Sequence, residues 1–269
     1  MDGTIALVDG GHLAFEDVGE GPAIVFLHPG LWDLRTWDPQ IVPFTDAGYR
    51  VIRYDLRGYG RSSRTTPEPY SHVADLYSLL DTLDVEQAAF VGCSMGGAVA
   101  IDAVLTAPAR AWALVTVAAG LGGFEPTTEE EEWWEDAGAG IEEAVEAGEL
   151  VRAQDLRLAI WAPLGTEDAA GATIRRIAFD NIHELTMDES GEIELDPPAA
   201  HRLHEIDAPT LVLKAEHDPP DMRRISDLIA AGVPGARARM IEGADHVVNL
   251  RQPAAFDDAV LPFLDEVRP

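Results

Sequence analysis

The pentapeptide GCSMG at residues 92–96 constrains the fold of this chain more than any other segment. It follows an apolar run at residues 88–91 and precedes a run with helical spacing at residues 95–107. A serine flanked by glycines two positions away, between a strand and a helix, is typical of a nucleophile elbow. Such a turn strains the backbone of the serine, and the small residues let neighbouring chain pass close to it. The sequence therefore predicts that Ser94 projects its hydroxyl as a nucleophile.

Cys93 is the one cysteine of the chain and a rival nucleophile. An elbow centred on it would put Val91 and Met95 at the positions that need small residues, so we interpret Cys93 as a small buried neighbour. A single cysteine forms no internal disulfide, and the N-terminus lacks a secretory signal. These features favour a cytoplasmic location.

Short apolar runs alternate with longer amphipathic segments over most of the chain, which predicts a mostly parallel sheet flanked by helices. An opening hairpin is expected at residues 5–16. The expected strands are residues 23–27, 50–54, 88–91, 112–117, 209–214 and 236–241, and the expected helices are residues 37–47, 72–83, 95–107 and 253–267.

The composition changes between about residues 121 and 205, where Glu, Ala and Trp are frequent and no strand-like run occurs. Thr127 and Glu130 have the spacing of a capping box, which marks the start of a helix. We expect residues 121–205 to be an inserted helical unit that interrupts one core, formed by residues 1–120 and 206–269.

A base and an acid are needed to activate the serine hydroxyl. His246 lies in a loop just beyond the last expected strand, and catalytic loops gather at the carboxyl ends of the strands in such sheets. The loop after residues 209–214 supplies the acid. Asp218 is favoured because it precedes the turn-forming prolines, and Glu216 remains the alternative.

The chain order Ser94, Asp218, His246 matches the order of the α/β hydrolases. With YDLRGYGRS at residues 54–62 and AEHD at residues 215–218, the chain resembles this superfamily. The resemblance implies an α/β-hydrolase sheet with an inserted helical cap over the active site. We expect no cofactor and no metal ion.

The resemblance also implies two backbone N–H donors for an oxyanion. One is that of Met95, after the nucleophile. The other comes from the loop after Leu27, where Pro29 has no N–H to give. We assign the second donor to Gly30, with Leu31 as the alternative. The neighbouring His28 is expected to brace this loop.

The run GLWDLRTWDPQ at residues 30–40 is similar to the corresponding segment of 3-oxoadipate enol-lactonases and esterase-like relatives. We therefore predict a serine hydrolase for a small carboxylic ester or lactone. A C–C bond hydrolase or perhydrolase on the same triad, and a slow-turnover ligand sensor, remain alternatives. The aromatic residues predicted to bind substrate are Trp32, Trp133, Trp134 and Trp161. The alternative, that most of these residues pack the cap against the core, stays open.

The formal net charge of −29 would repel nucleic acids and anionic lipid surfaces. No segment has the roughly 20 apolar residues that a membrane span requires. The expected partner is a small-molecule substrate, and the oligomeric state is open. Four arginines, each also a candidate for a surface ion pair, could bind a substrate carboxylate: Arg35, Arg57, Arg175 and Arg176.

Overall fold

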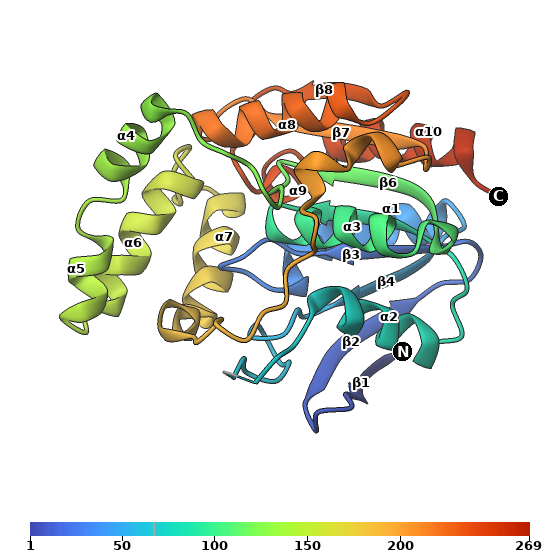
Figure 1. The fold of residues 1–269 in the computed structure, drawn as a ribbon, viewed down its shortest axis with the longest axis horizontal. Coiled ribbons are helices and arrows are strands. Elements are labelled where there is room, and N and C mark those ends of the chain that lie inside the picture. The colour runs from blue at the N-terminus through green and yellow to red at the C-terminus, as the bar shows by residue number, and fades with distance from the viewer. Residues whose placement is uncertain (67) are drawn as a thin grey trace.

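An eight-stranded sheet forms the centre of the protein in a computed structural model that describes residues 1–66 and 68–269 (Figure 1). The strand order is β1-β2-β4-β3-β5-β6-β7-β8. β1 and β2 pair antiparallel at one edge, and the other six strands run parallel. The strands are β1 (Asp2–Ala6), β2 (His12–Val18), β3 (Ala23–Leu27), β4 (Arg50–Tyr54), β5 (Ala88–Cys93), β6 (Ala111–Val117), β7 (Thr210–Ala215) and β8 (Arg237–Ile241). The predicted mostly parallel sheet is confirmed.

Helices cover both faces of this sheet. Along β3, Val25 and Leu27 face the cluster that includes α2, α3 and α8, whereas Ile24 and Phe26 face α1 and α10. This alternation follows from the two-residue period of a strand and explains why its residues are all apolar. The helices are α1 (Asp38–Asp46), α2 (His72–Thr82), α3 (Met95–Thr106), α4 (Thr128–Ala137), α5 (Ile141–Glu146), α6 (Leu150–Trp161), α7 (Ala169–Asp180), α8 (Pro220–Gly232), α9 (Val248–Arg251) and α10 (Pro253–Val267).

Between β6 and β7 the described chain forms four α-helices, α4 to α7, which lie together beside the sheet at the left of Figure 1. Thr127 and Glu130 form the predicted capping box at the start of α4. Glu130 also makes a two-pronged ion pair with Arg224 of α8, with both nitrogen–oxygen distances at 2.7 Å. This pair attaches the start of the segment to the sheet-bearing part of the chain.

None of the helices in the described residues combines the length and apolar character needed to cross a membrane.

Candidate active site

Ser94 occupies the tip of a tight turn between β5 and α3. Its φ is 51° and its ψ is −118°, a region that residues other than glycine rarely adopt. The backbone on either side is held in place: the Ser94 N–H donates to Val117 O at 3.0 Å, and its carbonyl accepts from Gly120 at 2.9 Å. Unlike its buried neighbour Cys93, Ser94 is a partly exposed residue.

The two glycines of the pentapeptide permit this turn because a side chain at either position would collide with backbone. A Cβ atom at Gly92 would lie 2.2 Å from Gly96 O, and one at Gly96 would lie 2.4 Å from Leu27 O. The latter contact brings the first turn of α3 against the end of β3, where the loop with Gly30 begins. The elbow and this loop are therefore neighbours.

His246 and Asp218 form a buried pair next to the elbow. Asp218 follows β7, His246 follows β8, and the Asp218 Oδ1 to His246 Nδ1 distance is 2.7 Å, with both side chains 2% exposed or less. Glu216 instead accepts a hydrogen bond from the Gly243 N–H at 2.8 Å and is about half exposed. The buried Cys93 thiol lies 3.5 Å from His246 O, which places the histidine loop against the elbow.

The loop after β3 carries the candidate oxyanion donors. Among the described residues, the N–H groups of Gly30, Leu31 and Met95 make no hydrogen bond within the protein. His28 braces this loop: its Nε2 accepts from the Leu56 N–H at 2.8 Å and its Nδ1 lies 2.8 Å from Pro29 O. Burial lowers the pKa of His28 to about 4, so the ring is neutral and carries its proton on Nδ1.

A chain of tryptophans leads from His246 into the inserted helices. The Trp161 ring centroid lies 4.3 Å from that of His246, Trp134 lies 5.3 Å from Trp161, and Trp133 lies 5.0 Å from Trp134. Trp32 is different, because it is fully buried and its indole N–H donates to Ile174 O at 2.9 Å. It packs the loop after β3 against α7.

The arginines that could have bound a carboxylate each face an acidic side chain. Arg35 pairs with Asp33 and Asp180, and Arg57 with Asp75 and Asp9. Arg175 pairs with Asp155, and Arg176 lies 4.0 Å from Asp180.

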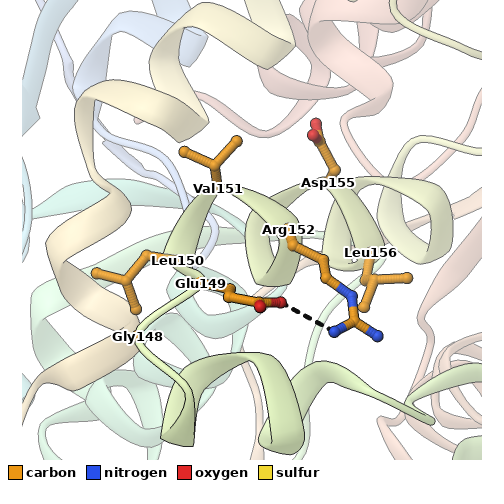
Figure 2. Close-up of a pocket in the computed structure, with 7 residues that line it drawn as sticks. All are labelled: Gly148, Glu149, Leu150, Val151, Arg152, Asp155 and Leu156. Atoms are coloured by element: carbon orange, nitrogen blue, oxygen red, sulfur yellow. Dashed lines mark hydrogen bonds and ion pairs between the residues drawn. The ribbon is translucent and has the colours of Figure 1, made fainter.

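An open pocket of about 600 Å³ lies at the start of α6. Figure 2 shows the residues that line it, among which Arg152 donates a hydrogen bond of 2.9 Å to Glu149. Ser94, Asp218 and His246 are not among these residues. The residues that line the pocket are Gly148, Glu149, Leu150, Val151, Arg152, Asp155 and Leu156. This pocket is not part of the candidate active site.

Sequence reasoning missed Asn181, which follows α7 and is fully buried. Its side chain hydrogen-bonds Asp33 in the loop after β3 and Gly60 in the loop after β4. No motif or periodicity marks this residue, because its partners are far away in the sequence.

Comparisons with known proteins agree on the family. The family model for the alpha/beta hydrolase fold matches residues 22–253. A Mycobacterium tuberculosis protein provisionally named a non-heme bromoperoxidase is 29% identical over 96% of this chain and 99% of its own. A Pseudomonas putida protein named a 2-hydroxy-6-oxononadienedioate/2-hydroxy-6-oxononatrienedioate hydrolase is 26% identical over 98% and 94%. A solved structure described as an N-acyl homoserine lactone degrading enzyme is 29% identical, with a TM-score of 0.72 over 96% and 99%. Members of this family with nearly the same length bear the names of enzymes, and this chain belongs to the α/β-hydrolase fold family.

Proposed function

We propose that the protein is a serine hydrolase that cleaves a small carboxylic ester or lactone through an acyl-enzyme. The observation that carries this proposal is the buried 2.7 Å contact between Asp218 and His246, beside a strained and partly exposed Ser94. A carboxylate on Nδ1 keeps that nitrogen protonated and leaves Nε2 free to act as a base. These contacts support the assignment of Ser94 as nucleophile, His246 as base and Asp218 as orienting acid, which is also the chain order of the family.

In the proposed reaction, Ser94 Oγ attacks the carbonyl carbon of the ester while His246 takes the proton of the Ser94 hydroxyl. The carbonyl π electrons move onto oxygen, and the N–H groups of Met95 and Gly30 donate to that oxyanion. The oxyanion collapses, the alkoxide leaves, and His246 returns the proton to it. With a lactone the alcohol stays attached to the acyl chain. His246 next takes a proton from a water molecule as the water oxygen attacks the acyl carbon. His246 returns this proton to Ser94 Oγ as that oxygen leaves, which releases the acid and restores the Ser94 hydroxyl.

The proposed cap is residues 121–205, and the substrate would bind between it and the core. Trp161 of this segment lies against His246 and Trp134 lies against Trp161, which supports a substrate with an apolar portion of small to medium size. The formal charge of −29 disfavours strongly anionic substrates. The paired state of the candidate arginines points the same way. We further propose that Trp32 acts by packing the cap onto the core.

Cleavage of a C–C bond on the same triad is the second candidate. It is favoured by the Pseudomonas putida relative, which matches nearly the whole chain and bears the name of such a hydrolase. The two candidates share Ser94, Asp218 and His246, so the substrate decides between them.

The test is an activity screen of the purified protein on p-nitrophenyl esters, lactones and 1,3-diketones, with Ser94→Ala as the control. We expect hydrolysis of esters or lactones that the variant lacks. A fluorophosphonate should add its phosphonyl group to Ser94 alone, as located by mass spectrometry. Preferential cleavage of the diketones would favour the second candidate. If the protein bound one of these compounds without cleaving it, and the fluorophosphonate did not label Ser94, the protein would be a ligand sensor.

A further inference from the structure

The buried amide of Asn181 joins the inserted helices to both loops that surround Gly30. Its Nδ2 donates to Asp33 Oδ2 at 2.8 Å and to Ile177 O at 2.9 Å. Its Oδ1 accepts from the Gly60 N–H at 2.7 Å. These partners fix the orientation of the amide, since a backbone N–H needs the oxygen and a carboxylate needs the nitrogen.

The first route from Asn181 to Gly30 runs through Asp33, three residues along the same loop. Asp33 is 2% exposed and caps the short 3-10 helix Leu34–Trp37. Burial alone would raise its pKa, but hydrogen bonds from Arg35 and Asn181 outweigh this and hold the pKa below the usual range. Asp33 is therefore a carboxylate at neutral pH, and its negative charge is stabilised by the hydrogen bonds from Arg35 and Asn181.

The second route runs through Gly60 and its neighbour Tyr59. The Tyr59 hydroxyl lies 3.6 Å from the position that a Cβ atom would take on Gly30, and its ring packs edge-on against His28 at 5.3 Å. A single side chain of the inserted helices thus holds both segments that contact Gly30.

The loop needs such support because its backbone is strained. Leu31, directly after Gly30, has a φ of 71°. A residue with a side chain keeps this conformation only where the surrounding structure imposes it. The Trp32 to Ile174 hydrogen bond and the paired Arg35 and Asp180 add contacts between the same loop and α7.

Resting on the proposed function, we propose that Asn181 is a positioning residue for the oxyanion hole, through which α7 fixes the Gly30 loop in the conformation that donates to the oxyanion. The insertion then has two roles, to enclose the substrate and to hold one of the two donors in place. Such a residue acts on the transition state more than on substrate binding.

The test compares Asn181→Asp with Gln154→Glu as the matched control. Gln154 is a second fully buried amide of the same helices, and its Nε2 donates to Ala178 O at 2.8 Å. Both substitutions replace an amide by a carboxyl group, but only the first places it against Asp33. Thermal unfolding identifies the conditions under which each variant is folded.

In Asn181→Asp we expect kcat on p-nitrophenyl esters to fall roughly 10- to 100-fold at pH 8, with KM within about threefold, since displacing a donor costs less than the roughly 10²- to 10³-fold of removing one. The two carboxyl groups would share one proton at low pH and repel each other at high pH. The ratio of variant to wild-type kcat should therefore be highest at low pH and fall as pH rises. Gln154→Glu should show no such trend in kcat. A pH-independent ratio, or one matching Gln154→Glu, would overturn the proposal.

Hydrogen exchange tests the same point without turnover, using Asn181→Ala in case the aspartate variant does not fold. Peptides covering residues 30–36 and 58–62 should exchange faster than in the wild type, while those of Gln154→Glu should not. Unchanged exchange in these peptides would refute the positioning role whatever the activity. If exchange rises but the wild type hydrolyses no ester or lactone, the proposed function fails and the structural coupling stands.

Discussion

Replacing Asp218 by asparagine should remove most of the activity while leaving the fold intact. The carboxylate lies 2.7 Å from His246 Nδ1, and neither side chain is more than 2% exposed, so no water can replace the charge. An amide of the same shape can donate to the ring, which favours the wrong tautomer. We expect kcat to fall by up to about 10⁴-fold, the effect of changing the acid of a serine protease triad to asparagine. This loss corresponds to about 5 kcal/mol of transition-state stabilisation.

The matched control is Glu216→Gln, two residues earlier in the same loop. Glu216 is about half exposed and accepts from the Gly243 N–H, so its amide should cost less than roughly tenfold. Steady-state kinetics on p-nitrophenyl butyrate, with unfolding temperatures to show that both variants fold, measure the difference. A crippled Glu216→Gln beside a mild Asp218→Asn would make Glu216 the third member of the triad and refute this reasoning.

Three further outcomes can be measured. Gly92→Ala should prevent folding of the elbow, because its Cβ would lie 2.2 Å from Gly96 O, whereas Gly122→Ala, which meets nothing within 4 Å, should leave solubility and activity unchanged. Cys93→Ala should keep most of the activity, and the native thiol should react slowly with iodoacetamide, because burial raises its pKa. Burial also raises the pKa of Asp102 to about 6. Ionisation of this group therefore lowers the free energy of unfolding as pH rises from about 4 to 6. Asp102→Asn should therefore stabilise the protein by about 1–2 kcal/mol at pH 8 and weaken that pH dependence, as thermal unfolding would show; an unchanged unfolding temperature would contradict it.

Features encoded by adjacent residues could be predicted from the sequence. The nearly continuous apolar runs predicted the buried strands, and Thr127 with Glu130 predicted the start of α4. The hairpin was predicted as residues 5–16, but its strands are Asp2–Ala6 and His12–Val18. Polar residues in edge strands carry a weak periodic signal, which explains the difference in these bounds.

Contacts between distant residues could not be predicted in the same way. Trp32 was among the tryptophans predicted to bind substrate. The structure instead buries it completely against α7, although this contact alone does not test substrate binding. Asn181 lies 148 positions from Asp33, and a lone asparagine after a helix is an ordinary helix end in any sequence.

The topology explains why residues in the loop motifs could be predicted from the sequence and Asn181 could not. Parallel strands bring their carboxyl ends to one edge of the sheet. The loops after β3, β5, β7 and β8 therefore lie at this edge together. Motifs on those loops can be recognised one at a time. The helices inserted after β6 begin at the same edge, and their contacts with the loops depend on how α6 and α7 pack. Candidate catalytic residues can therefore be recognised in short segments, whereas the contacts of Asn181 with Asp33 and Gly60 become visible only in the packed structure.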